Sequence, residues 1–467
     1  RRNKARAHRR TGHAHMRLLT LFAGFAAAAA FSSLPPLERT WEEKVIDAWA
    51  AEPDCSPETG MCGACGVAAT VVELGENGTQ PIVRKYSVGA GGGETPFGSD
   101  ATFEIASVTK LFTTMLLLVL EEEGLLSSEA TIGTYLPCAW DAARHAGTAE
   151  ITFNELVRHT SGLPAQPPDR GPSVGGNPFS GYTEERLCES LGQLTGLPTR
   201  GRYSYSNYAY GTLGYVLTLA YAAVTGSPVR DYEDLLKEKV LDPLGLTATS
   251  VTYDDAGWNA AAEGCARGYS RGETTIRRGA YGVLQGNGAL RSTQDDMGQF
   301  LLAYLVVDAG ADAPPELASL FPASLLTAME RALDNVAPAC SCTSGWCEGN
   351  LCELPNPPQE SITVGGVEHY TSGGVDGWRK SGDTGGYSLR VAWSYEKRRA
   401  AFAVDTCGGC GERGTSGSSA QRLVLLLADG PPSASVPVLT ALQLTHTCTV
   451  LVYSPNSRLY TILTLAL

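Results

Sequence analysis

The longest apolar helix of the chain constrains its fold more than any other segment. From Ser107 to Leu126 the sequence is SVTKLFTTMLLLVLEEEGLL, and its body is almost entirely hydrophobic. A helix that is apolar all round is stable only when it is buried on all sides, so this segment is expected at the centre of a sizeable core. The chain can supply one, because 43% of its 467 residues are hydrophobic and only 18% are charged.

Strand-like segments lie at both ends of the chain. Residues 67–74 and 82–88 form two β-rich runs separated by the hairpin signal Gly75-Glu76-Asn77-Gly78. Near the other end, residues 387–393 alternate in polarity and residues 400–404 form a short apolar run. Between them, from about 131 to 335, the pattern is mainly helical. An α/β (α+β) fold is predicted, with one sheet built from both termini, flanked by helices and interrupted by a large, mainly helical insertion.

The N-terminal segment, residues 1–37, has the pattern of a leader. Seven Arg or Lys residues precede the first acidic residue, Glu38, and Met16 is followed by the apolar run 18–31. These features predict a secretory signal peptide and a secreted or extracytoplasmic protein, with a mitochondrial presequence as the alternative. The apolar run is too short for a comfortable membrane span, so no span is expected in the mature chain.

Three further regions are predicted after the leader. The first is one discontinuous α/β domain made of residues 38–130 and 355–429. It opens with a helix over 38–51 and ends with a helix over 418–428. Residues 131–354 form a helical domain. The tail, 430–467, has one charged residue and no clear period. A membrane-attachment signal, an extra strand pair and a gene-model artefact all remain open for it.

Charge and cysteine content limit the partners and the compartment. A net charge of −13 argues against nucleic acid, which prefers a basic face. Thirteen cysteines favour an oxidising compartment and disulfides. The C-x-x-C spacings at Cys62–Cys65 and Cys407–Cys410 also suit zinc, and free thiols are the third alternative. No H-E-x-x-H or comparable ligand set occurs among the seven histidines, and neither a catalytic metal nor a cofactor is expected.

Ser107 and Lys110 form the first candidate catalytic pair. A serine three residues before a lysine places both side chains on one helix face, one turn apart. Free backbone N–H groups at the helix start favour developing negative charge on a substrate. A desolvated lysine can lose its proton and accept the proton of the serine. The same spacing at Ser394 and Lys397 lies in a charged turn and is interpreted as chance.

Two later segments supply further candidates. Tyr205 and Asn207 precede a new helix; nearby positive charge would lower the proton affinity of the phenol, and the amide suits an amide-bearing substrate. Lys380, followed by Ser381, Gly382 and Asp383, lies in a strand before a glycine turn, where it can bind a carboxylate or stabilise charge. Taken alone, the first segment is an aromatic helix cap and the second an exposed edge strand.

These three elements, in this order, resemble the serine β-lactamase and penicillin-binding protein superfamily, whose motifs are S-x-x-K, Y-x-N or S-D-N, and K-T-G. The tyrosine places the resemblance with class C β-lactamases, D-Ala-D-Ala carboxypeptidases and related esterases. Four further stretches are similar to family segments, and the resemblance spans about residues 38–429. The stretches are Phe153–Pro164, Tyr205–Gly214, Leu241–Leu246 and Gly288–Thr293.

The resemblance implies a β-lactamase/transpeptidase-like fold, an antiparallel sheet and roles for the site. Ser107 would be the nucleophile, Lys110 and Tyr205 its proton-transfer partners, and Asn207 a ligand of the substrate amide. Lys380 and Ser381 would bind a carboxylate or stabilise charge. Gly382 would let the backbone N–H groups approach a bound carbonyl closely. The backbone N–H groups of Ser107 and Asp383 would form the oxyanion hole.

Asp383 stands where β-lactamases usually carry a small residue, and its carboxylate should repel an anionic substrate. The expected activity is therefore that of a serine hydrolase acting through an acyl-enzyme on a small-molecule or peptide substrate, with an esterase or peptidase favoured over a true β-lactamase. The alternative is an inactive binding or scaffold protein with the same fold. The sequence leaves the oligomeric state open.

The resemblance also implies a disulfide and bears on two rival sites. The family's N-terminal strand pairs with its last strand, which would bring Cys62 and Cys65 near Cys407 and Cys410.

A G-x-S-x-G match at 171–175 lies in a Pro-rich loop, without the strand and helix that a nucleophile elbow needs. His159 lies in a turn and is interpreted as structural.

Overall fold

The computed structural model describes most of the chain between residues 67 and 405. The chain divides into two units, 1–44 and 45–467, and every described residue lies in the second. The described residues are 67–75, 81–88, 101–138, 147–169, 179, 181–194, 196–251, 269–270, 273–274, 281–338, 361–372, 375–384, 387–405, 424, 450–452 and 461–463. The predicted leader, the helices expected over 38–51 and 418–428, and Cys62, Cys65, Cys407 and Cys410 lie outside them, apart from Val424.

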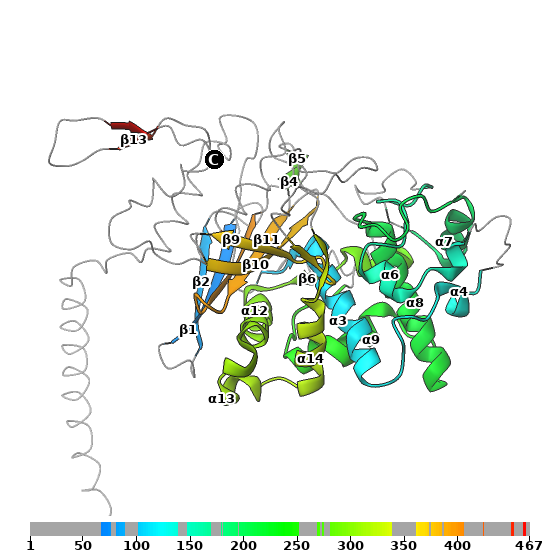
Figure 1. The fold of residues 1–467 in the computed structure, drawn as a ribbon, viewed down its shortest axis with the longest axis horizontal. Coiled ribbons are helices and arrows are strands. Elements are labelled where there is room, and N and C mark those ends of the chain that lie inside the picture. Colours follow the sequence, from blue (N-terminus) through cyan, green and yellow to red (C-terminus); the bar gives the residue numbers. More distant parts are fainter. Residues whose placement is uncertain are drawn as a thin grey trace, which may run out of the picture. The chain divides into compact units, whose positions relative to one another are not determined.

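One antiparallel sheet, built from both ends of the chain, organises the fold (Figure 1). Its strand order is β2-β1-β12-β11-β10-β9-β8-β7, so the predicted α/β (α+β) fold with a sheet from both termini is confirmed. The strands are β2 (Pro81–Val88), β1 (Val67–Leu74), β12 (Arg399–Asp405), β11 (Ser388–Ser394), β10 (Val375–Asp383), β9 (Glu368–Ser372), β8 (Ser361–Thr363) and β7 (Asn335–Pro338).

The N-terminal strand β1 is joined to the late strand β12, as the resemblance implies. Val67 pairs with Asp405 and Glu73 with Arg399 in this antiparallel register. Every residue of β11 and β12 is buried, so both faces of the sheet are covered at its centre. Strands buried on both faces tolerate charge only where it is paired, which makes Arg390 in β11 a position to explain.

Two helices of the later part of the insertion, α12 (Gln294–Ala309) and α14 (Ala323–Ala332), pack against the sheet and against α3. α12 packs on β1, β11 and β12, and α14 packs on α3. The Thr293 hydroxyl accepts a hydrogen bond from the Asp296 N–H and so caps the start of α12. The short α13 (Pro315–Ala318) and the 3₁₀ turn η7 (Gly310–Asp312) connect the two helices.

The apolar segment predicted at the centre is the helix α3 (Thr109–Glu122), preceded by the 3₁₀ turn η3 (Ala106–Val108). All of its residues from Thr109 to Leu120 are buried, which confirms its central position. The two-residue strand β3 (Phe103–Glu104) leads into it and pairs with β6 (Arg291–Ser292). This pairing joins the start of α3 to the segment directly before α12.

The remaining helices include α4, α6, α7 and α8, which lie on the right of Figure 1. α8 is long and mostly buried, and it packs on α6, η6 and α3. These helices and turns are α4 (Ile132–Tyr135), η4 (Thr148–Glu150), α6 (Phe153–Val157), α7 (Glu184–Gly192), α8 (Asn207–Thr225), α9 (Tyr232–Leu236), η5 (Lys237–Leu241), α10 (Asp242–Leu244) and η6 (Gly282–Asn287).

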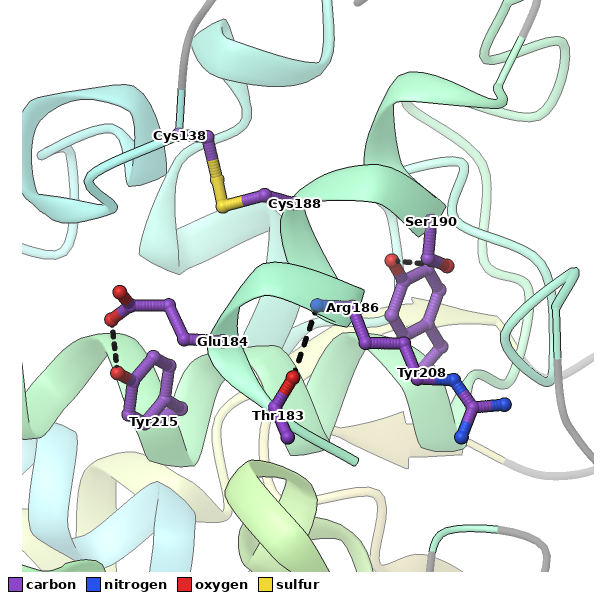
Figure 2. Close-up of a disulfide and its surroundings, with 8 residues drawn as sticks. All are labelled: Cys138, Thr183, Glu184, Arg186, Cys188, Ser190, Tyr208 and Tyr215. Atoms are coloured by element: carbon purple, nitrogen blue, oxygen red, sulfur yellow. Dashed lines mark hydrogen bonds between the residues drawn. A yellow bond between two sulfur atoms is a disulfide. The ribbon is translucent and has the colours of Figure 1, made fainter. Parts of the chain in front are cut away.

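A disulfide between Cys138 and Cys188 joins the segment after α4 to α7 (Figure 2). α7 is further attached to α8, because Glu184 accepts a hydrogen bond from the Tyr215 hydroxyl and Tyr208 donates one to Ser190 at 2.9 Å. Disulfides were expected from the cysteine content, but this pair was not singled out. The disulfide attaches α7 to the segment after α4, and the two hydrogen bonds attach α7 to α8, which begins at the candidate site.

Two small sheets complete the described structure. β4 (Tyr269–Ser270) pairs with β5 (Glu273–Thr274), and β13 (Val450–Val452) pairs with β14 (Thr461–Leu463). The β13–β14 pair lies in the tail, 430–467, and the role of the tail stays open. Within the described residues, no helix has the length and apolarity that crossing a membrane requires.

Candidate active site

Ser107 lies in a strained turn at the entrance to α3. Ala106, directly before it, has a left-handed backbone with φ of 47°, which costs energy for any residue other than glycine. Ile105 donates its N–H to the Leu290 carbonyl at 3.0 Å, which anchors the turn to the β6 segment. The turn leaves Ser107 partly exposed, whereas the helix that follows is buried.

Lys110 is buried one helical turn beyond Ser107, as predicted. Its Nζ lies 3.0 Å from Ser107 Oγ, 2.8 Å from Asn207 Oδ1 and 2.5 Å from the backbone carbonyl oxygen of Asn287. Burial, and then the charge of Lys380, lower the pKa of Lys110 well below its usual range. The environment therefore favours the neutral amine.

The three partners of Lys110 fit a neutral amine in one particular arrangement. The Asn207 and Asn287 oxygens can only accept, so they take the two N–H groups of the amine. The lone pair is then directed at the third partner, the hydroxyl of Ser107, which can donate. This geometry suits removal of a proton from Ser107 Oγ.

Tyr205 is the second side chain in contact with Ser107 Oγ. Its hydroxyl lies 2.8 Å from Ser107 Oγ, and the centroid of its ring lies 5.1 Å from Lys110 Nζ and 5.6 Å from Lys380 Nζ. Burial, assisted by the charge of Asp383, nonetheless raises the pKa of Tyr205, and the hydrogen bond with Ser107 opposes that rise. The expected lowering by positive charge is wrong here, because desolvation of the phenolate outweighs it.

Lys380 and Gly382 bring strand β10 against the nucleophile turn. Lys380 is buried, and burial lowers its pKa to about 8, with Glu368 opposing the shift and Arg390 adding to it. A Cβ on Gly382 would lie 2.4 Å from the Ile105 carbonyl oxygen and 3.2 Å from the Ser107 nitrogen. Only glycine allows this approach of β10 to the helix start.

Asp383 has a partner that sequence reasoning missed. Arg390 donates two hydrogen bonds to its carboxylate, at 2.9 and 3.0 Å, and the Ser388 hydroxyl donates a third at 2.7 Å. Arg390 also contacts the Gly382 carbonyl oxygen at 3.3 Å. The carboxylate is 54% exposed but fixed in place, and the guanidinium compensates part of its charge. Ser381 is partly exposed on the same strand, between Lys380 and Gly382.

Of two further groups in the site, the Arg390 side chain and the Asn287 carbonyl, only Arg390 left a signal in the sequence. Arg390 interrupts the apolar run Ser388–Trp393, and a charge inside a buried strand indicates a partner on a neighbouring strand. The Asn287 carbonyl left none, because any residue can present a backbone oxygen.

Of the alternative serine motifs, the structure describes the Ser394–Lys397 pair but not the G-x-S-x-G match. Ser394 and Lys397 lie at the end of β11 and in the turn after it, where Lys397 is exposed, so no helix start joins them. The G-x-S-x-G match at 171–175 lies outside the described residues. Among the described residues, no group of three or more His, Cys, Asp or Glu side chains could hold a metal ion.

Comparison with known sequences places this site in a family. The sequence profile of the β-lactamase family matches residues 60–339. Over 250 residues the chain is 30% identical to the D-alanyl-D-alanine-carboxypeptidase/endopeptidase AmpH of Escherichia coli K12, covering 53% of this chain and 59% of AmpH. It is 33% identical over 162 residues to β-lactamase-like protein 2 of Dictyostelium discoideum, covering 34% and 28%. The chain thus spans less than two thirds of these relatives.

Solved structures share the fold over nearly their whole length. A β-lactamase/D-alanine carboxypeptidase from Yersinia pestis, complexed with citrate, superposes with a TM-score of 0.58 at 23% identity, covering 83% of this chain and 98% of that one. A class C β-lactamase from Rhodobacter sphaeroides superposes with a TM-score of 0.53 at 20% identity, covering 77% and 94%. At these identities the likeness establishes the β-lactamase/transpeptidase-like fold and no more.

Proposed function

Because the chain belongs to the β-lactamase family, within the serine β-lactamase and penicillin-binding protein superfamily, we propose that it is a serine hydrolase that acts through an acyl-enzyme. One observation carries the proposal. Ser107 Oγ lies between Lys110 Nζ at 3.0 Å and the Tyr205 hydroxyl at 2.8 Å, so a nucleophile has a proton acceptor and a proton relay within reach.

In the proposed acylation, neutral Lys110 accepts the Ser107 proton while Oγ attacks the carbonyl carbon of an amide or ester. The tetrahedral intermediate then collapses and expels an amine or alcohol as the C–N or C–O bond breaks. The leaving group takes the proton that Lys110 accepted, relayed through the Tyr205 hydroxyl, and Lys110 becomes neutral again. Water subsequently hydrolyses the acyl-enzyme and regenerates Ser107. The lowered pKa of Lys110 and the raised pKa of Tyr205 support these two roles in proton transfer: the amine of Lys110 is the base, and the neutral phenol of Tyr205 is the relay.

The charge that develops on the substrate oxygen requires donors. We assign them to the backbone N–H groups of Ser107 and Asp383, with Asn207 binding the substrate amide. Lys380 and Ser381 would bind a carboxylate or stabilise the developing charge. The close approach of Gly382 to the Ser107 nitrogen supports this assignment, since it brings the two backbone segments together. Asn207 would serve substrate and Lys110 at once, because its oxygen accepts from Nζ and leaves its amide N–H groups for a carbonyl.

For the substrate, we favour a neutral ester or peptide over an anionic antibiotic. Asp383 places a fixed, half-exposed carboxylate at the end of the strand that carries Lys380. Arg390 weakens the resulting repulsion without removing it. A D-alanyl-D-alanine peptide is the second candidate, supported by the name of AmpH.

For the compartment, we retain the secreted or extracytoplasmic location. The Cys138–Cys188 disulfide supports it, because structural disulfides persist in oxidising compartments.

The direct test is hydrolysis by three proteins: wild type, Ser107→Ala and the control Ser319→Ala, which alters an exposed serine on α13's C-terminal side. The panel contains p-nitrophenyl esters, D-amino-acid amides and a chromogenic cephalosporin. The proposal expects turnover of at least one neutral substrate, lost in Ser107→Ala and kept in Ser319→Ala. Equal turnover in Ser107→Ala would refute it. Absence of turnover and of labelling by a fluorophosphonate or a labelled penicillin would favour the non-catalytic binding protein.

A further inference from the structure

The segment from His159 to Ala165 runs beside the segment that carries Tyr205 and Asn207. Four hydrogen bonds from backbone N–H or hydroxyl groups of residues 201–207 end on its backbone oxygens. They run from Gly201 N–H to Thr160 O at 2.7 Å, Ser204 N–H to His159 O at 2.7 Å, Ser206 Oγ–H to Pro164 O at 2.7 Å and Asn207 N–H to Ala165 O at 2.9 Å. The His159–Ala165 segment therefore acts as a template for the backbone that presents both side chains.

His159 adds a side-chain contact at the middle of this template. Its Nδ1 accepts a hydrogen bond from the Ser206 N–H at 3.0 Å, between the two site residues Tyr205 and Asn207. Its ring lies 4.7 Å from the ring of Tyr205 and 4.7 Å from that of Tyr210, measured between centroids. The imidazole is 1% exposed, and the backbone of His159 is left-handed with φ of 57°.

These contacts require one protonation state of the imidazole. Because Nδ1 accepts, the ring proton must be on Nε2, which has no hydrogen-bond partner among the described residues. A second proton on Nδ1 would turn the acceptor into a donor facing the Ser206 N–H. Burial, and then the charges of Lys110 and Lys380, lower the pKa of His159 well below its usual range, so the ring stays neutral.

The same geometry excludes His159 as a base for Ser107. One ring nitrogen is occupied by the Ser206 N–H and the other carries the proton, so no lone pair is available. A second base is also unnecessary, because Lys110 already contacts Ser107. What His159 can control is the position of the residues on either side of Ser206.

We propose that His159 is a positioning residue: its Nδ1 fixes the Ser206 backbone and thereby holds Tyr205 against Ser107 and Asn207 against Lys110. The inference rests on the proposed hydrolase function. Without the acceptor, the buried Ser206 N–H would lose its partner, and the segment would relax away from the template. Tyr205 would then leave the 2.8 Å contact with Ser107 Oγ on which proton relay depends.

The chain permits a test by conservative rescue. In His159→Asn, Oδ1 occupies the same place along the side chain as Nδ1 and can accept from the Ser206 N–H, and asparagine tolerates a left-handed backbone. In His159→Gln, the oxygen is one bond further out and misses that place. His369→Asn is the matched control, since His369 lies on β9, partly exposed, against Trp378.

The measurement is the rate constant for acylation by a p-nitrophenyl ester or a fluorophosphonate, with kcat and KM determined separately and the unfolding temperature recorded. We expect His159→Asn and His369→Asn to stay within about threefold of wild type. His159→Gln should lose about 10²-fold in kcat, the cost of a misplacement of about 1 Å, with little change in KM.

The possible results separate the two proposals. Wild-type rates in a folded His159→Gln would overturn the positioning role, as would equal losses in His159→Asn and His159→Gln, which would assign the effect to ring stacking alone. If His159→Gln does not fold, His159→Asn is compared with His159→Leu, which offers no acceptor. The positioning role predicts a higher unfolding temperature and a faster acylation in His159→Asn than in His159→Leu, and equal values would overturn it. Absence of acylation in the wild type would instead refute the hydrolase proposal.

Discussion

The approach of Gly382 to the nucleophile turn makes Gly382→Ala the most informative single perturbation. A Cβ at this position would lie 2.4 Å from the Ile105 carbonyl oxygen, whereas real Cβ atoms essentially never approach closer than 3.0 Å. Strand β10 and the turn must therefore separate by at least about 0.6 Å. The added carbon also lies 3.3 Å from Ala106 Cβ, so rotation toward that side gives little relief.

The size of the effect follows from this displacement. In the proposed site, β10 carries one oxyanion donor and the turn carries the other, so their separation loosens both contacts to the developing charge. A misplacement of 1 Å costs about 10²-fold in rate, and loss of one oxyanion donor costs about 10²–10³-fold. We expect Gly382→Ala to slow acylation by about 10–100-fold and to lower the free energy of unfolding by roughly 1–3 kcal/mol.

The assay is stopped-flow acylation by a p-nitrophenyl ester, with denaturant unfolding measured on the same protein. Gly196→Ala is the control, because no atom lies within 4 Å of its added Cβ and its backbone is not left-handed. It should acylate at the wild-type rate. A Gly382→Ala protein that also acylates at the wild-type rate would refute the close approach of β10 to Ser107, and with it the assigned oxyanion donors.

Three further outcomes are expected. Tyr205→Phe keeps the ring beside Lys110 but removes the hydroxyl 2.8 Å from Ser107 Oγ, so single-turnover acylation should slow by about 10²-fold or more; a wild-type rate would exclude Tyr205 as the proton relay. Lys380 has a pKa lowered to about 8, so its ammonium is lost as pH rises through that value, and KM for a carboxylate-bearing ester should increase above about pH 8 relative to its methyl ester. Lys380→Gln should abolish this change in KM, and a change that persists in the variant would contradict the assignment of Lys380 as the carboxylate-binding group. The same pKa also affects stability: because the pKa of Lys380 is higher in the unfolded chain, the unfolded state binds more protons above pH 8, and the contribution of Lys380 to the free energy of unfolding rises with pH there. Cys188→Ser opens a loop whose ends are 50 residues apart, which should lower the free energy of unfolding by about 2–4 kcal/mol in a denaturant titration, and an unchanged value would show that the disulfide does not stabilise the fold.

The sequence predicts those features that depend on apolar patterning and on order along the chain. The helix that begins after Ser107 is buried because its composition leaves no polar face, and β1 pairs with β12 because both ends of the chain carry strand patterns. The resemblance selects Ser107, Lys110 and Tyr205, and the structure brings their reactive atoms together.

Other features depend on tertiary contacts that no local pattern encodes. The pKa of Tyr205 rises because the folded chain desolvates its phenol, and that burial could not be weighed against the charge of Lys110 beforehand. The partner of Asp383 depends on the β10–β11 register, which pairs Arg390 with Ser381, two residues before Asp383 on β10. The Cys138–Cys188 pair could not be selected among thirteen cysteines, because spacing does not encode connectivity.

The central claim is that Ser107 carries the acyl group, and mass spectrometry of the trapped intermediate tests it most directly. The protein is treated with a fluorophosphonate or a labelled penicillin, digested and mapped by tandem mass spectrometry. We predict a single adduct on the Ser107 hydroxyl, absent from Ser107→Ala and slowed in Tyr205→Phe. An adduct on any other residue, or one that persists in Ser107→Ala, would contradict the account.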